Sequence, residues 1–146
     1  MENKTKVIEI RGLTKRLKNK TVLNDVTLDI FAGDICGISG HNGSGKSMLL
    51  KAISGFLQPT SGSIKVFGED VGVHGKLAKD TGVLIEAPGL LLGYSAFDNL
   101  YMLARLDGFK DKTAIEEILT TLELDPKDKR PVSKYSLGMK QKVGIA

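Results

Sequence analysis

The sequence predicts an α/β fold built around a glycine-rich loop, and three features of its 146 residues support this prediction. Residues 40–47, Gly-His-Asn-Gly-Ser-Gly-Lys-Ser, match the pattern G-x-x-x-x-G-K-[ST]. An apolar segment, Asp34–Ser39, precedes this loop as a strand would, and Met48–Phe56 follows it with helical spacing of its apolar residues. Finally, helical periodicity replaces strand-like alternation from Ser95 onward. We therefore expect a loop-bearing core with a partial parallel sheet, an antiparallel β layer and an inserted helical subdomain.

The composition is that of an ordinary globular protein. Hydrophobic residues make up 41% of the chain, and the net charge of +4 is mild. The first six residues lack the apolar core of a secretion signal, which predicts a cytoplasmic protein. The single cysteine, Cys36, lies in the segment predicted to be a buried strand, so we interpret it as a small core residue rather than a reactive thiol.

The antiparallel layer is predicted from the first part of the chain. Residues 7–11 and 22–31 form two expected strands, and 63–67 alternates in the same way and is expected to join them. The turn between the first two strands belongs to a lysine-rich stretch, residues 15–20. We interpret that stretch as a solvated turn, with contact to nucleic acid or anionic lipid as the alternative.

The parallel strands and the helical subdomain follow. Residues 34–39 and the apolar run Thr81–Ile85 are expected to be parallel strands buried on both faces. Helices are predicted from Ser95 and from Thr113, where Thr113–Glu116 has the pattern of a capping box. Ser136 is the expected N-cap of a last helix. The predicted divisions are 1–94 for the core, 95–135 for the helical subdomain and 136–146 for the start of the last helix.

The chemistry of residues 40–47 predicts nucleotide-phosphate binding. Gly40, Gly43 and Gly45 let the backbone curl around phosphate oxygens, because glycine tolerates positive φ and presents no side chain. Lys46 supplies a charge for the β- and γ-phosphates, and the Ser47 hydroxyl is a ligand for Mg²⁺. The remaining loop positions expected to line the nucleotide are His41, Asn42 and Ser44.

Taken together, these segments resemble the ATP-binding cassette of ABC transporters over essentially the whole chain, and the resemblance implies a P-loop NTPase core. Residues 59–64 look like the family's P-x-x-G-x-[IV] segment, and residues 135–141, Tyr-Ser-Leu-Gly-Met-Lys-Gln, are similar to its L-S-G-G-Q signature. This variant of the signature looks like the branch that exports drugs or peptide antibiotics or confers self-immunity. The two motifs in this order indicate the family more specifically than either motif does alone.

Two positions depart from the family pattern. The resemblance places Glu86 where the family has a glutamine that contacts Mg²⁺ or water, and a carboxylate still suits a metal ligand. It places Leu17 where the family has an aromatic residue that stacks on adenine, which implies looser recognition of the base. Both residues are therefore candidates for the cofactor site.

The resemblance also implies a mechanism. Two cassettes close head to tail around ATP and Mg²⁺, one offering residues 40–47 and the other offering Ser136 and Gly138 to the γ-phosphate. The full-length protein would be an ATPase at the inner face of the cell membrane, coupled to a membrane-spanning permease that exports a substrate. The chain stops before the Walker B aspartate and the catalytic base, so we interpret it as an N-terminal fragment with negligible hydrolysis of its own.

The sequence leaves three alternative functions open. An ABC-type ATPase acting on nucleic acid or ribosomes is the first alternative, and the exporter-like signature and Glu86 argue against it, so no nucleic-acid partner is expected. An unrelated phosphate-loop enzyme, such as a small-molecule kinase, would give Ser136 no role. A non-catalytic binding module is the third possibility.

Overall fold

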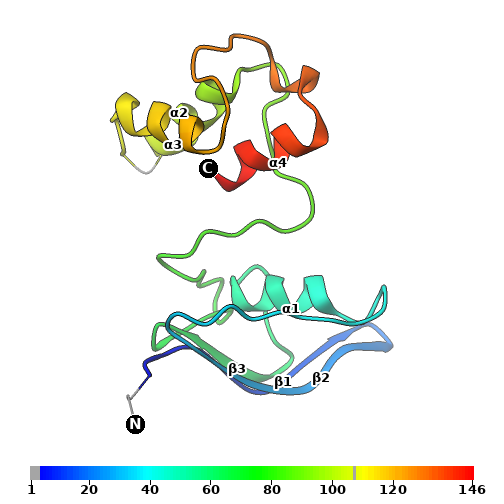
Figure 1. Cartoon of the computed structure of the whole chain (residues 1–146). Helices are drawn as coiled ribbons and strands as arrows, with labels where there is room; N and C mark the ends of the chain where they lie inside the picture. Colours follow the sequence, from blue (N-terminus) through cyan, green and yellow to red (C-terminus); the bar gives the residue numbers. More distant parts are fainter. Residues whose placement is uncertain (1–3, 107) are drawn as a thin grey trace. The chain divides into compact units, whose positions relative to one another are not determined.

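The computed structural model describes residues 4–106 and 108–146, which form two compact units (Figure 1). The first unit ends at Ile85, and the second begins at Glu86. The first carries the glycine-rich loop, and the second carries Ser136 and Gly138.

The first unit is an antiparallel sheet with one helix against it. Two long strands form a hairpin whose turn is Lys18–Asn19, and the four strands described pair in the order β2-β1-β3-β4. All pairs are antiparallel, as predicted for residues 7–11, 22–31 and 63–67. The elements are β1 (Lys6–Leu17), β2 (Lys20–Phe31), α1 (Lys46–Ile53), β3 (Ser61–Val66) and β4 (Glu69–Asp70).

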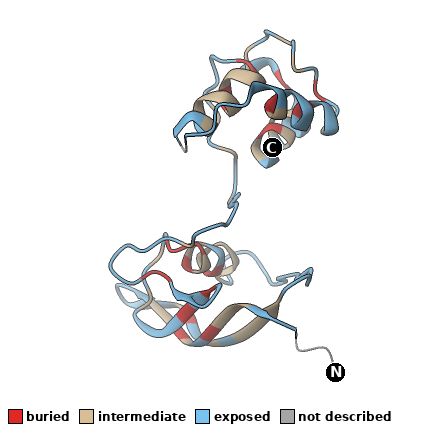
Figure 2. Ribbon diagram, turned by 90° about the vertical axis from the view of Figure 1, so that its left-hand side faces the viewer, coloured by how far each residue is buried: buried red, intermediate tan, exposed pale blue. Residues whose placement is uncertain are grey.

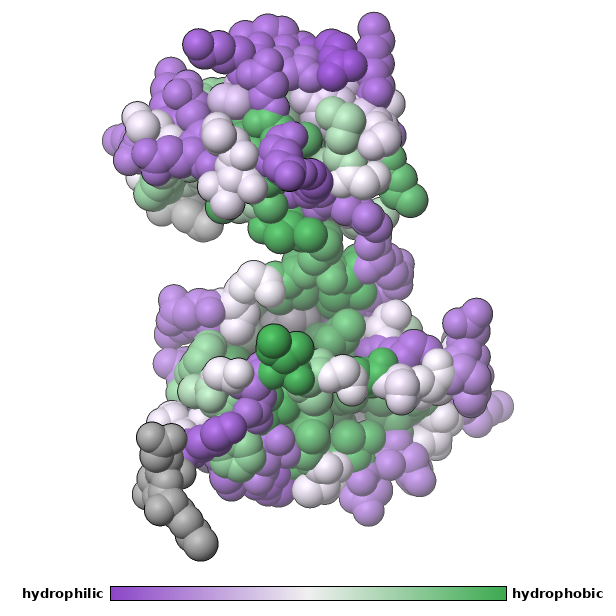
Figure 3. Space-filling model, in the orientation of Figure 1, coloured by the Kyte–Doolittle hydropathy of each residue, from purple (hydrophilic) through white to green (hydrophobic). Residues whose placement is uncertain are grey.

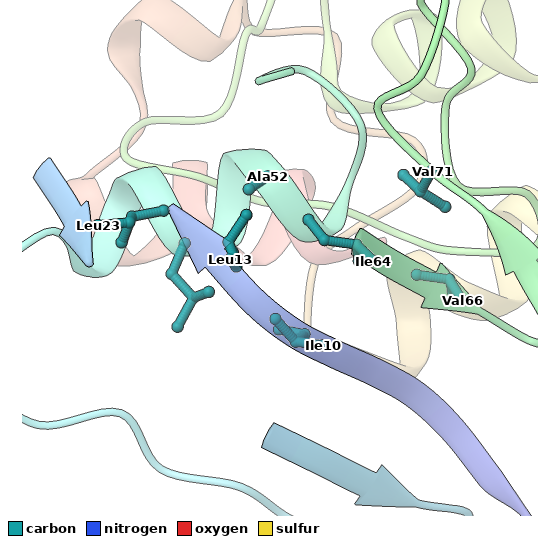
Figure 4. Close-up of a cluster of buried hydrophobic side chains, with 8 residues drawn as sticks. Ile10, Leu13, Leu23, Ala52, Ile64, Val66 and Val71 are labelled. Atoms are coloured by element: carbon teal, nitrogen blue, oxygen red, sulfur yellow. The ribbon is translucent and has the colours of Figure 1, made fainter. Parts of the chain in front are cut away.

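The core of this unit lies between α1 and the sheet. Ile10 and Leu13 of β1 are fully buried, and they form one cluster with Ile64 of β3 and with Leu49 and Ala52 of α1 (Figure 4). Buried positions accordingly occur on α1 and on the strands (Figure 2). Because burial of apolar side chains is the main favourable contribution to folding, this contact fixes where α1 and the loop before it lie.

Two predicted strands are wrong. Residues 34–39 and 81–85 form no strand, and no described strand runs parallel to another. Ile35 and Cys36 are exposed, so the prediction that Cys36 is a core residue is also wrong. A parallel strand requires a hydrogen-bonded neighbour about 4.8 Å away, and neither segment has one among the described residues.

Residues 81–85 lie instead beside α1. They line an apolar cavity of about 270 Å³ together with Leu50 and Ile53, which belong to α1. Val83 and Leu84 remain 45% and 41% exposed there. In the view of Figure 3, hydrophobic residues accordingly reach the surface of this unit.

The second unit is helical. Its helices are α2 (Ala96–Leu106), α3 (Lys112–Thr121), the 3₁₀ helix η1 (Val132–Lys134) and α4 (Leu137–Ile145). A second core joins them, and its buried members are Ala96, Ile115, Leu119, Leu124, Val132, Tyr135 and Val143. The helical periodicity predicted from Ser95 onward is therefore confirmed.

Helix caps set the starts of α2 and α3. Ser95 Oγ accepts a hydrogen bond from the Asp98 backbone N–H at 3.1 Å and donates one to the Asp98 carboxylate at 2.6 Å. The capping box predicted at Thr113 is wrong, because α3 already begins at Lys112, two residues before the Ala114 start that a Thr113 cap would give. Its N-cap is Asp111, whose carboxylate accepts from the N–H groups of Thr113 and Ala114.

Among the described residues, no helix combines the length and the apolar character needed to cross a bilayer.

Leu119→Ala tests the core of the second unit, because Leu119 is fully buried. We expect this substitution to lower the free energy of unfolding by about 2–5 kcal/mol, through lost transfer energy and a residual cavity. Leu103→Ala on α2 is the matched control, since Leu103 is 57% exposed, and should cost about 1 kcal/mol or less. Urea unfolding followed by circular dichroism measures both, and equal losses would contradict this packing.

Candidate nucleotide-phosphate site

The glycine-rich loop, residues 40–47, leads directly into the N-terminus of α1. Gly45 is the N-cap of this helix, and its carbonyl accepts the first helical hydrogen bond, from the Leu49 N–H at 2.8 Å. A glycine cap has no side chain to accept the N–H groups of the first turn, and no acidic residue occupies that turn. These donors and the helix dipole therefore leave a partial positive charge available to an anion.

Gly45 also approaches the sheet closely. Its φ is +97°, and a Cβ at this position would lie 2.6 Å from the carbonyl oxygen of Val22 on β2. Both the conformation and the contact therefore exclude a larger residue. Gly43 also has positive φ, at +81°, but a Cβ there would meet no atom within 4 Å. Gly45 therefore fixes the loop against β2, whereas Gly43 only shapes its turn.

The ammonium group of Lys46 lies across the loop. Its Nζ donates hydrogen bonds to the carbonyl oxygens of Gly40, at 2.7 Å, and His41, at 2.9 Å. The His41 carbonyl also accepts from the Ser44 N–H, which closes a turn within the loop. An ammonium has three N–H donors, so Lys46 places positive charge at the loop while ordering its backbone.

The remaining loop residues present polar groups around the turn. His41 and Asn42 are exposed, and the imidazole Nδ1 of His41 lies 2.9 Å from the Asn42 carbonyl oxygen. Ser47 occupies the first turn of α1 and is half-buried. The structure thus brings residues 40–47 together at one helix end, as the motif predicts.

Leu17 belongs to the same unit as the loop. It is the last residue of β1, pairs with Lys20 across the hairpin and is 41% exposed. Lys20 is two residues along β2 from Val22, whose carbonyl meets Gly45. The hairpin that carries Leu17 is therefore the one against which the loop packs.

The other predicted site residues belong to the second unit. Ser136 is the N-cap of α4, as predicted, and its Oγ accepts a hydrogen bond from the Met139 N–H at 3.2 Å. Gly138 is exposed, and a Cβ there would meet no atom within 4 Å. Glu86 is the first residue of this unit and adopts positive φ, at +69°. The roles assigned to Leu17, Glu86, Ser136 and Gly138 stay predictions.

One group of contacts was not predicted from the sequence. Tyr135, directly before Ser136, is buried, and its hydroxyl donates to the Asp128 carboxylate at 3.2 Å. Hydrogen bonds from Arg130 lower the pKa of Asp128 to about 2. Burial raises the pKa of the Tyr135 phenol above its usual value. The available sequence signal is an aromatic residue beside an N-cap, and it does not identify these partners.

A glycine-rich loop that caps a helix and holds a lysine across its turn defines a phosphate-binding protein of the P-loop class. The family model described as "ABC transporter" matches residues 23–146, which is most of the chain. The chain therefore belongs to the ABC transporter family.

Curated relatives agree with this membership. The chain is 40% identical to an uncharacterized ABC transporter ATP-binding protein, YybJ, of Bacillus subtilis (strain 168), over 96% of this chain and 64% of that protein. It is 36% identical to the bacitracin transport ATP-binding protein BcrA of Bacillus licheniformis, over 96% of this chain and 46% of that protein. It is also 36% identical to the lantibiotic transport ATP-binding protein SrtF of Streptococcus pyogenes, over 96% of this chain and 60% of that protein. The chain thus spans less than two thirds of each relative.

Solved structures support the fold. A structure described as the ATP binding subunit of an ABC transporter superposes with a TM-score of 0.81 at 26% identity, over 95% of this chain and 60% of that one. The dimeric ATP-binding cassette MJ0796 bound to ADP and phosphate matches with a TM-score of 0.78 at 22% identity, over 94% of this chain and 67% of that one, which bears on fold alone. The predicted family and P-loop α/β fold class are therefore confirmed.

Substitution of the two loop glycines tests the contact with β2. Gly45→Ala should lower the free energy of unfolding of the first unit by about 1–2 kcal/mol from positive φ and by about 1–3 kcal/mol more from the clash with Val22. Gly43→Ala is the control and should show only the first effect, because its surroundings are open. Urea unfolding of both variants measures the difference. Indistinguishable losses would show that the loop is not held against β2.

Proposed function

We propose that this chain is the nucleotide-binding part of an ABC exporter subunit that binds ATP and Mg²⁺ and, in the full-length protein, hydrolyses ATP to drive export. The observation that carries the proposal is the loop at the α1 N-terminus, where Lys46 lies across the turn and the helix has no side-chain cap. Two of the relatives above are named for transport of bacitracin and of a lantibiotic. These names support peptide-antibiotic export, not the alternative of action on nucleic acid.

The loop supplies the binding chemistry. Backbone N–H groups at the start of α1 would receive the phosphates, and Lys46 would exchange a carbonyl contact for an oxygen of the β- or γ-phosphate. In the family's reaction, water attacks the γ-phosphorus in line, and charge builds up on the phosphoryl oxygens. Lys46, as a fixed cation beside those oxygens, would stabilise that charge.

The donor set suits Mg²⁺. Mg²⁺ prefers hard oxygen ligands and usually keeps several waters and phosphate oxygens, so it needs few protein groups. The Ser47 hydroxyl and the Glu86 carboxylate are oxygen donors of this kind. Among the described residues no cluster of three or more His, Cys, Asp or Glu side chains forms a site of its own. When bound, the ion would neutralise charge between the phosphates.

The second unit would complete the site in a dimer. The N-terminus of α4, with Ser136 and the open Gly138, has the features of a second anion site. We propose that it contacts the γ-phosphate held by a second copy, in a two-fold head-to-tail arrangement. The third component would be a membrane-spanning permease, and the subunit would lie on the cytoplasmic face of the cell membrane.

Lys46→Ala tests the phosphate contact. We expect ATP affinity to fall at least tenfold, because a charge-assisted hydrogen bond contributes about 1.5–3 kcal/mol. AMP affinity should change little, since AMP lacks the β- and γ-phosphates. Lys65→Ala, an exposed position on β3, is the control and should leave both affinities unchanged. Isothermal titration calorimetry with Mg²⁺ present measures them, and undiminished ATP binding would contradict the proposed site.

Leu17→Tyr tests base recognition. Stacking of a base on an aromatic ring contributes about 1–3 kcal/mol, so we expect ATP to bind roughly fivefold tighter or more. Inorganic tripolyphosphate has no base, and its affinity should stay the same. Leu17→Val is the control without a ring. Unchanged ATP affinity in the tyrosine variant would show that the base does not lie at the hairpin tip.

A further inference from the structure

The N-terminus of α4 combines exposed residues with a buried neighbour. Ser136, Leu137 and Gly138 are all exposed, as a surface that meets a partner must be. Tyr135, immediately before them, is only 5% exposed and belongs to the core of the second unit. The contacts that hold Tyr135 in the core therefore also determine where Ser136, the exposed N-cap of α4, lies.

An ion pair holds the phenol of Tyr135. The hydroxyl donates to Asp128 Oδ2 at 3.2 Å, and Arg130 donates to the same carboxylate through Nη2 at 2.7 Å and Nε at 3.1 Å. The Arg130 guanidinium also lies over the Tyr135 ring, 5.7 Å from its centroid. Because the pKa of Asp128 is about 2, the carboxylate stays ionised at neutral pH and remains an acceptor for both donors.

The backbone around Tyr135 is equally constrained. The Tyr135 N–H donates to the Val132 carbonyl at 3.1 Å, which closes η1. The N–H groups of Val132 and Ser133 donate to the carbonyls of Tyr94, at 2.8 Å, and Leu92, at 3.1 Å. Residues 132–135 are therefore tied to the segment that leads into α2, and the orientation of Ser136 follows from theirs.

Core packing alone does not account for this arrangement. A phenylalanine ring would fill the same space between the helices, whereas the hydroxyl and its ion pair fix the ring's direction as well. Asp128 is the shared acceptor, and its side chain is only 14% exposed. A hydrogen bond of this kind specifies orientation at a modest net gain in stability.

We propose that Asp128, Arg130 and Tyr135, here named the Tyr135 anchor, position the N-terminus of α4 so that Ser136 meets the γ-phosphate held by a second copy. The anchor residues are positioning residues and touch no nucleotide themselves. This inference rests on the proposed function, because it assigns the anchor to the dimeric ATP site proposed above.

Tyr135→Phe in the full-length protein tests the anchor. The measured quantity is the dissociation constant of the homodimer formed with Mg²⁺ and the β,γ-imido analogue of ATP, by analytical ultracentrifugation. Loss of one hydrogen bond should weaken the dimer roughly three- to tenfold and leave nucleotide affinity of the monomer unchanged. Tyr94→Phe, at a half-exposed tyrosine of the same unit, is the matched control and should dimerise like the wild type.

A double-mutant cycle with Ser136→Ala separates positioning from a merely structural role. If the anchor acts through Ser136, Tyr135→Phe should lose at least half of its effect on the dimer when Ser136 is already alanine. Additive losses would overturn the anchor while leaving the proposed function intact. A wild-type protein that binds the analogue but stays monomeric would overturn the dimeric site and the anchor with it.

A second variant tests the Tyr135 anchor without changing Tyr135 itself. If Tyr135→Phe does not fold, Arg130→Lys keeps the positive charge but loses the bidentate contact and the planar stacking. We expect it to weaken the dimer and to be non-additive with Ser136→Ala in the same way. Additivity in this cycle would likewise overturn the proposal.

Discussion

The candidate site depends on the close contact between Gly45 and β2. Residues 40–44 form an exposed turn, and such a turn has little to hold it unless something rigid lies beneath it. The rigid part is the core between α1 and the sheet, where Ala52 belongs to one buried cluster with Ile10 and Ile64. Gly45 connects that core to the loop, because only glycine fits against the Val22 carbonyl at this φ. Lys46 then orders the remaining turn through two carbonyl contacts.

The two units use different means to present a polar helix end. In the first unit the cap of α1 is a glycine, which leaves the N–H groups of the first turn without a side-chain acceptor. In the second unit Ser136 itself caps α4 by accepting from the Met139 N–H, and the buried Tyr135 beside it is held by an ion pair. The first arrangement favours direct binding of phosphate. The second favours a fixed surface with one hydroxyl and an open glycine.

Local patterns predicted much of this molecule, and non-local contacts account for the errors. Alternation predicted β2 and β3, and a contiguous motif predicted the loop, because both signals lie within a few residues. The strands predicted from the apolar runs 34–39 and 81–85 are absent. Hydrophobicity shows that a segment suits burial, but it does not show whether a neighbouring strand is present to pair with it. Thr113 matched a capping box, yet the N-cap is Asp111, two residues earlier, whose carboxylate accepts from the N–H groups of Thr113 and Ala114. The Tyr135 anchor spans Asp128 to Tyr135, and no periodicity reports such a contact.

We propose that the phosphates of ATP bind at residues 40–47. Backbone amide chemical shifts, recorded by NMR while Mg²⁺ and ATP are added, locate the binding site residue by residue. We expect the largest saturable shifts at Gly43, Gly45, Lys46 and Ser47, because their N–H groups would meet the phosphates. Saturable binding that leaves the amides of residues 40–47 unmoved would show that the phosphates bind elsewhere.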